Sequence, residues 1–196
     1  MQILIFEGIA TSGKSTVIGN LEKALQPDKK VRVAYEDETH VPIMEARAEL
    51  HLEFFKHLIN KIVSEKADIA ILDRLYMTQA YRAKSNLGPY KELEEYLGQH
   101  NARTIFLKVD EGGIAERIRK ATLHRDPEWS EYVKTHGQEE QIASYYIEQQ
   151  RGQLELLEQS KLPYKIFDTT LHDYDAVTKE ILGLTKMPLK REAKCT

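Results

Sequence analysis

The sequence predicts an α/β fold in which helices cover both faces of a parallel sheet. Short apolar runs of the kind that buried parallel strands show alternate with helical patterns along the chain. Strands that alternate with helices form right-handed βαβ units, which make the sheet parallel. Ligands of such sheets bind beyond the carboxyl ends of the strands, so a site is expected there. The acidic side chains at those ends are Glu7, Glu36, Asp73, Asp110 and Asp168.

The first half of the chain contains three of the expected strands, at residues 2–7, 31–35 and 68–73. A helix is expected after the first strand, because Val17, Leu21 and Leu25 are spaced for one face. A second helix should begin near Pro42, a residue suited to a first helical turn, and run to about residue 66. A third helix is expected over residues 74–85, before the turn sequence Asn-Leu-Gly-Pro at residues 86–89.

The second half contains the other two strands, at residues 104–109 and 164–168. Helices are expected over residues 90–98 and 114–122, the second of them after a pair of glycines. A long helix should cover much of residues 128–159, with Gly137 as a point where it can divide, and a last helix residues 173–182. Residues 186–196 are polar and are expected to form a loose tail, which leaves one domain over residues 1–185.

Composition argues against several classes of function. The chain has 196 residues, of which 41% are hydrophobic and 30% charged, as in one soluble globular domain. Its net charge of −3 gives no electrostatic footprint for binding nucleic acid. No apolar run approaches the length that spans a membrane. The single cysteine, Cys195, cannot form an internal disulfide, so we expect a reducing compartment and a cytoplasmic protein.

The most specific motif is Gly8-Ile9-Ala10-Thr11-Ser12-Gly13-Lys14-Ser15-Thr16, which fits the phosphate-binding loop (P-loop) pattern. It lies between an expected strand and an expected helix, so backbone N–H groups and the helix N-terminus should bind the phosphates of ATP. Lys14 should reach the β- and γ-phosphates, exposed to ligand rather than packed, while Ser15 ligates Mg²⁺ and Thr16 donates to the α-phosphate. The residues expected to bind the donor are Gly8, Ala10, Thr11, Ser12, Gly13, Lys14, Ser15 and Thr16.

Charged residues near the other strand ends are candidates for catalysis. Asp73 is expected to hold Mg²⁺, although it could also cap the following helix. Arg74 should bind the transferring phosphate or the acceptor, unless it forms a surface ion pair. The basic stretch with Arg117, Arg119 and Arg125 is expected to close over the transferring group as a lid, the alternative being a solvated helix face. Arg117 and Arg119 lie two residues apart, so both cannot face the site.

Four stretches together resemble the thymidylate kinases and the related deoxynucleoside kinases. They are residues 6–16, Asp73-Arg74-Leu75-Tyr76, residues 110–120, and Ile166-Phe167-Asp168-Thr169-Thr170. The resemblance implies a three-layer P-loop kinase fold, with a five-stranded parallel sheet in the order 2-3-1-4-5 and a helical lid over about residues 114–130. It also implies ATP as donor, Mg²⁺ as cofactor, a small nucleoside or nucleotide as acceptor, Thr169 near the donor base, and a homodimer as one arrangement of the chain.

The chain departs from this resemblance after the second strand. Thymidylate kinases usually carry Arg-Glu-Pro-Gly there, whereas this chain has Tyr35-Glu36-Asp37-Glu38-Thr39. Deoxynucleoside kinases keep a glutamate at that place as the general base, which a hydroxyl acceptor needs and a monophosphate does not. The acidic stretch would also repel a phosphate. We therefore expect Glu36 to act as base, and a hydroxyl acceptor such as a deoxynucleoside more than a monophosphate.

Two other functions share parts of this pattern. A P-loop kinase of a non-nucleotide small molecule would carry the same motifs and differ only in its acceptor pocket. A nucleotide-hydrolysing switch is less favoured, because the Asp-x-x-Gly stretch at residues 110–113 follows the fourth strand, too late for such a switch. If the chain is a nucleoside or nucleotide kinase, as favoured here, the residues predicted to take part in phosphoryl transfer are Lys14, Glu36, Asp73, Arg74, Arg117 and Arg119.

Overall fold

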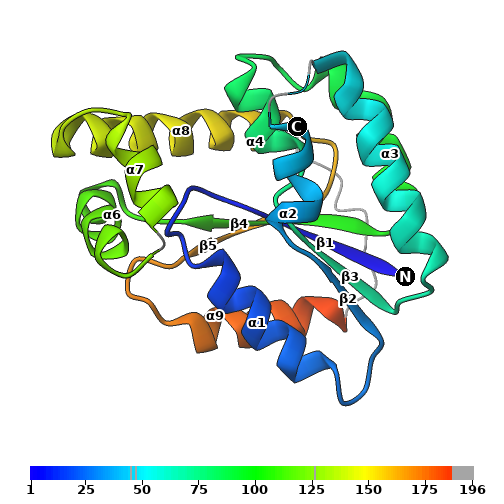
Figure 1. Cartoon of the computed structure of the whole chain (residues 1–196). Coiled ribbons are helices and arrows are strands. Elements are labelled where there is room, and N and C mark those ends of the chain that lie inside the picture. The colour runs from blue at the N-terminus through cyan, green and yellow to red at the C-terminus, as the bar shows by residue number, and fades with distance from the viewer. Residues whose placement is uncertain (45, 47, 126, 187–196) are drawn as a thin grey trace.

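The chain forms a single five-stranded parallel sheet between two layers of helices (Figure 1). The computed structural model describes residues 1–44, 46, 48–125 and 127–186. The strand order is β2-β3-β1-β4-β5, and every neighbouring pair is parallel, which confirms the predicted fold class and order. The strands are β1 (Gln2–Glu7), β2 (Val31–Ala34), β3 (Ile69–Asp73), β4 (Ala102–Lys108) and β5 (Tyr164–Asp168).

One face of the sheet is covered by α1 (Lys14–Leu25) and α9 (Tyr174–Thr185), which lie side by side below it in Figure 1. Val17, Leu21 and Ile181 belong to the core between these helices and the strands. On the other face lie α3 (Ala48–Ser64), α4 (Tyr76–Arg82), α5 (Lys91–Gln99) and α8 (Glu139–Gln159), with the 3₁₀ helix η2 (Gly88–Tyr90) before α5. Burial of apolar side chains against both faces is the main force that holds the three layers together.

The remaining helices follow the carboxyl ends of strands. They are α2 (Glu36–Thr39), the 3₁₀ helix η1 (Val41–Ile43), α6 (Glu111–His124) and α7 (Pro127–Lys134). A third apolar cluster ties α6, α7 and α8 to the phosphate-binding loop, with Ile9, Ile118, Val133 and Tyr146 buried in it. No helix among the described residues is long and apolar enough to cross a membrane.

Three predicted helices are shorter than expected or divided. The helix expected from Pro42 to residue 66 is divided into the 3₁₀ helix η1 and the helix α3, which begins at Ala48, and a short helix α2 precedes them, where the Thr39 hydroxyl donates to the backbone carbonyl of Asp73. The helix expected from residue 74 begins at Tyr76, since Arg74 has a left-handed φ of 64°. Gly137, at a φ of 108°, divides α7 from α8. The predicted polar tail lies, from residue 187 on, outside the described residues.

Candidate active site

The phosphate-binding loop joins β1 to α1, and two of its glycines are required by its shape. Gly8 has a φ of 138°, and a Cβ atom there would lie 2.5 Å from the carbonyl oxygen of Leu107. Gly13 has a φ of 93°, and a Cβ atom there would lie 2.3 Å from a ring carbon of Tyr174. Both backbone conformations favour glycine, and neither position has space for a side chain. The loop therefore has the conformation that the sequence motif predicted.

Lys14 is packed into the loop. Its side chain is 5% exposed, and Nζ donates to the carbonyl oxygens of Gly8 and Ile9 at 3.1 Å each. Burial, followed by the charge of Arg74, lowers the pKa of Lys14 to about 8. The prediction of a ligand-exposed lysine is therefore wrong for this conformation. A bound phosphate would have to replace two carbonyl partners with its own oxygens, while Ser15 and Thr16 are already exposed at the start of α1.

Asp73 lies at the end of β3, beside the loop, and has the properties of a metal-binding carboxylate. It is 3% exposed, and its Oδ1 has no hydrogen-bond partner within the described part of the chain. Burial raises the pKa of Asp73, while the charges of Lys14, Arg74 and Arg125 lower it. An unpartnered carboxylate oxygen at the end of the strand beside the loop fits Mg²⁺, which keeps few protein ligands and binds mainly through phosphates. The described residues contain no cluster of three or more His, Cys, Asp or Glu that could hold a metal ion.

Arg74 is held at the turn between β3 and α4 by side chains from three elements. Its Nε donates to Glu36 Oε1 at 2.7 Å, and its Nη1 donates to Thr78 Oγ1 at 3.1 Å. The Thr78 hydroxyl in turn donates to Glu7, which also accepts from the backbone N–H of Leu75. Arg74 is thus fixed in place by a buried network. The sequence identified Glu7 only as an acidic residue at a strand end and did not predict its hydrogen bonds to Thr78 and Leu75.

Glu36 is committed to this ion pair. Burial raises the pKa of Glu36, but Arg74 and Lys14 outweigh that effect and lower it to about 2. The neighbouring Glu38 forms an ion pair with Arg32 at 2.6 Å instead of with Arg74. The acidic stretch after β2 therefore supplies one carboxylate to the site rather than three.

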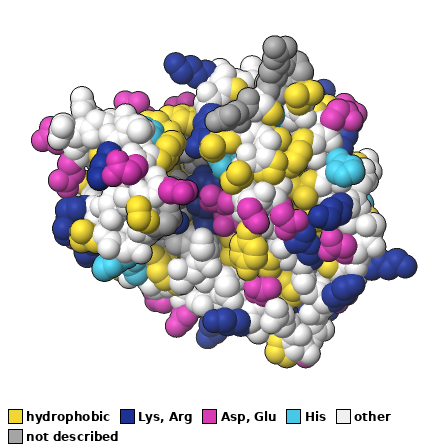
Figure 2. Space-filling view, viewed as in Figure 1, with side chains coloured by type: hydrophobic (Ala, Val, Ile, Leu, Met, Phe, Trp, Pro, Cys, Tyr) yellow, Lys and Arg dark blue, Asp and Glu magenta, His cyan; other side chains and the backbone are white. Residues whose placement is uncertain are grey.

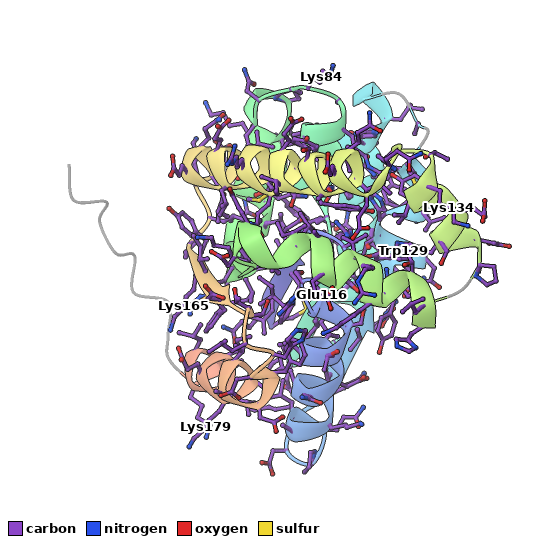
Figure 3. All side chains as sticks on the ribbon, turned by 90° about the vertical axis from the view of Figure 1, so that its left-hand side faces the viewer. Lys84, Glu116, Trp129, Lys134, Lys165 and Lys179 are labelled. Atoms are coloured by element: carbon purple, nitrogen blue, oxygen red, sulfur yellow. The ribbon has the colours of Figure 1, made fainter. Side chains whose placement is uncertain are left out.

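The basic side chains of the expected lid take three different positions. Arg117 is buried and donates to the carbonyl oxygens of Thr11 and Thr169. Arg119 pairs with Glu116 at 2.8 Å on the exposed side of α6, so the structure does not bring it to the loop. Figure 3 shows Glu116 on α6 and Trp129 near the start of α7. Arg117 and Arg119 face different ways, as their spacing predicted, and Arg119 pairs with Glu116 rather than with the loop.

Arg125 was considered with the lid but not selected from the sequence. Its guanidinium carbon lies 4.6 Å from the centre of the Trp129 ring, a cation–π contact. Burial raises the pKa values of Asp73 and Tyr146, and the charge of Arg125 lowers them by a smaller amount. Arg125 is therefore within electrostatic reach of the site. Thr169, which was predicted to lie near the donor base, donates its hydroxyl to the carbonyl oxygen of Ser12 at 2.8 Å.

Aromatic side chains from α7, α8 and the turn between them contact one another, and Tyr146 belongs to the apolar cluster that contains Ile9 of the loop. Tyr132, His136, Tyr145 and Tyr146 form a chain of ring contacts, and Arg82 of α4 donates to the hydroxyl of Tyr132 at 3.3 Å. Figure 2 shows a hollow between the part that carries α6 and α7 and the part that carries α2, with acidic and basic side chains gathered in it. The site thus combines a phosphate loop, a buried arginine and an aromatic wall.

The comparisons with known proteins agree with this geometry at the level of the fold. No protein-family model and no curated protein matches the sequence. Similar solved structures include the YorR protein from Bacillus subtilis in complex with phosphorylated GDP, at 19% identity and a TM-score of 0.68 over 94% of this chain and 96% of that chain. Shikimate kinase from Bacteroides thetaiotaomicron has 15% identity and a TM-score of 0.58 over 95% and 99% of the two chains.

Deoxyadenosine kinase from M. mycoides is also similar, at 15% identity and a TM-score of 0.52 over 95% of this chain and 100% of that chain. At these identities the likeness shows the fold alone, which is that of the P-loop kinases. The function must therefore be argued from the site itself.

Proposed function

We propose that this chain is an ATP-dependent phosphotransferase whose acceptor is a nucleoside or a nucleoside monophosphate. The observation that supports this most is the placement of Arg74, buried at the end of the strand beside the phosphate loop and fixed there by Glu36 and Thr78. In-line phosphoryl transfer needs a donor and an acceptor held on one line, and catalysis comes mainly from positioning and charge neutralisation. The loop would hold the donor, Arg74 the reacting end of the acceptor, and the tyrosines its aromatic base.

Each charged side chain has a separate task in this mechanism. Lys14 exchanges its two carbonyl partners for donor phosphate oxygens, and Arg74 donates to the group that is transferred. Arg125 moves from the Trp129 ring toward the transferring group, where it neutralises developing charge. Ser15 and Asp73 would hold Mg²⁺, which would neutralise charge on the donor phosphates.

The position of Glu36 changes the expected balance between the two acceptor classes. A general base is most effective when its pKa lies near the working pH, and the pKa of Glu36 is about 2. We propose that Glu36 mainly orients Arg74, which makes a monophosphate at least as suitable an acceptor as a hydroxyl. Replacement of Glu36 by Gln should then reduce turnover of both classes by a similar factor of about ten. A loss of 10²- to 10⁴-fold confined to nucleosides would restore the general-base role.

A substrate screen tests the proposed function as a whole. ATP with labelled γ-phosphate is incubated with a panel of nucleosides, their 5′-monophosphates, shikimate and gluconate, and labelled products are separated. Transfer to members of the nucleoside class alone is the expected result, because the tyrosines suit an aromatic acceptor. Transfer only to a non-aromatic acceptor, or ATP hydrolysis that no acceptor stimulates, would contradict the proposal.

A further inference from the structure

His40, the residue that closes α2, is a buried side chain that the mechanism above does not use. It is 5% exposed, and it contacts Gln79 of α4, which is 2% exposed. Nε2 of Gln79 lies 2.9 Å from Nδ1 of His40 and 3.5 Å from the backbone carbonyl oxygen of the same residue. A carbonyl oxygen can only accept, so Gln79 must present its NH₂ group to both atoms. His40 Nδ1 is then an acceptor, and the ring proton is on Nε2.

The surroundings of His40 keep it uncharged. Burial lowers the pKa of His40 to about 4, and Arg74, Arg82 and Lys14 act in the same direction. The charge of Glu36 opposes them. A protonated ring would also direct an N–H at the NH₂ group of Gln79. At neutral pH His40 therefore offers one fixed donor, the Nε2–H group.

This donor has no hydrogen-bond partner within the described part of the chain. It is not among the buried side-chain atoms that lack a partner there, so Nε2 reaches the molecular surface although His40 is only 5% exposed. The backbone N–H of His40 donates to the carbonyl of Glu36 at 2.9 Å, so the two residues are one helical turn apart. One turn of four residues is about 6 Å along the helix axis. Glu36 bonds to Arg74, so His40 lies close to the side chain proposed to hold the acceptor, and a bound acceptor can supply the partner of Nε2.

We propose that His40 determines acceptor specificity by donating its Nε2–H to an uncharged oxygen of the acceptor, and that Gln79 is the positioning residue that fixes the tautomer. This inference rests on the proposed function. The oxygen belongs to a base carbonyl or to a sugar hydroxyl, because either can accept from the Nε2–H group. An amino group of the acceptor at the same position could not accept a hydrogen bond from Nε2–H, because both groups are donors.

Kinetics of two variants test the role of His40. Replacement of His40 by Leu removes the donor and should raise the acceptor KM about tenfold, the effect of one hydrogen bond, with the KM for ATP unchanged. Replacement by Gln places an amide N–H near the position of Nε2 and should restore most of the lost affinity. Acceptor analogues that lack the sugar 3′-hydroxyl or one base carbonyl identify the oxygen, because its removal should weaken binding to the natural chain but not to His40→Leu.

A second readout does not depend on activity. The ¹⁵N shifts of labelled histidine should show Nε2 protonated and Nδ1 unprotonated at pH 7 in the natural chain. In Gln79→Glu the carboxylate accepts from Nδ1, so the ring should become protonated on both nitrogens at that pH. The acceptor KM of this variant should then depend on pH where that of the natural chain does not.

The outcomes are distinguishable. A proton on Nδ1 in the natural chain, or turnover by His40→Leu with an unchanged acceptor KM, would overturn this inference while the proposed function stands. If the natural chain phosphorylates no member of the nucleoside class, the proposed function fails, and the inference fails with it whatever the tautomer.

Discussion

Lys14 illustrates how one residue is held ready for a ligand before the ligand arrives. Two carbonyl partners stabilise a buried ammonium group less than water does, so burial disfavours the charged form and lowers the pKa of Lys14 to about 8. Donor phosphates would supply opposite charge at the same place and raise that pKa again. The side chain therefore stabilises the bound state of the loop more than the empty one.

Replacement of Lys14 by Ala should abolish phosphoryl transfer and leave the fold intact. The reason is the loss of the only ammonium group bonded to the loop among the described residues. Lys23 lies on the same helix, is exposed, and gives a matched control as Lys23→Ala. Steady-state turnover and thermal unfolding of both variants provide the measurement. Near-normal turnover by Lys14→Ala would defeat the assignment of the loop as the donor site.

His40 should make the protein sensitive to mild acid. The usual pKa of histidine is 6.5, and in the folded chain that of His40 is about 4. Between these values the unfolded chain binds one proton more, so the free energy of unfolding falls as the pH falls through this window. The slope is at most about 1.4 kcal/mol per pH unit, so over the 2.5 pH units between these values the whole effect is at most about 3.4 kcal/mol. Stability from His40 is fully present above pH 6.5.

Urea unfolding between pH 7 and pH 4 measures this effect. The raised pKa values of Glu7 and Asp73 act in the opposite direction, so the natural chain is compared with His40→Gln rather than taken alone. The difference between the two should follow the uptake of one proton. His57→Gln, at an exposed histidine, should match the natural chain. Equal pH dependence of all three proteins would show that His40 does not titrate as argued.

At the level of elements, the sequence predicts strands better than helix ends. Five apolar runs predicted five strands, since a buried parallel strand must be apolar on both faces. Helix boundaries depended on tertiary contacts that no local pattern shows. The bond from Thr39 to the carbonyl of Asp73 ends α2, and the left-handed Arg74 delays α4. Arg74 has that conformation at the site itself, where local rules are most often overridden.

Two glycines inside helices should respond to the same substitution in opposite ways. A Cβ atom on Gly152 of α8 would lie 2.6 Å from ring carbons of Tyr81, whereas one on Gly19 of α1 would meet nothing within 4 Å. Gly19→Ala should stabilise the protein by about 0.5–1 kcal/mol, the helix propensity difference. Gly152→Ala should destabilise it by about 1–3 kcal/mol, because overpacking outweighs that gain.

Urea unfolding of both alanine variants gives the comparison, and Tyr81→Ala supplies the control. In the Tyr81→Ala background the steric conflict is absent, so Gly152→Ala should become stabilising like Gly19→Ala. A destabilising effect that persists in that background would mean that Tyr81 is not the cause. The contact matters for function because it holds α4, which carries Gln79, against α8.

On the scale of the whole molecule, the site is assembled from segments that are far apart in the sequence. The loop at residues 8–16, α2, the start of α4, α6 and Thr169 meet at the carboxyl edge of the sheet, where α2, α4 and α6 lie in Figure 1. Topology made this edge predictable, because parallel strands end together. The choice among lid arginines was not predictable, since it depends on how α6 is rotated. That rotation directs Arg117 inward and Arg119 outward, and the charge of Arg125, at the end of α6, acts on Asp73.

The segment from Arg117 to Trp129 should behave as a lid whose acting residue is Arg125. Arg125→Gln is expected to lower kcat by about 10²-fold or more, because a donor to the transferring group acts mainly in the transition state. Arg119→Gln is the matched control on the exposed side of α6 and should leave kcat within about twofold. Hydrogen exchange of this segment should slow when an ATP analogue and an acceptor are bound together. Equal protection with and without ligands would argue against a lid, and equal kcat values for the two variants would remove Arg125 from the mechanism.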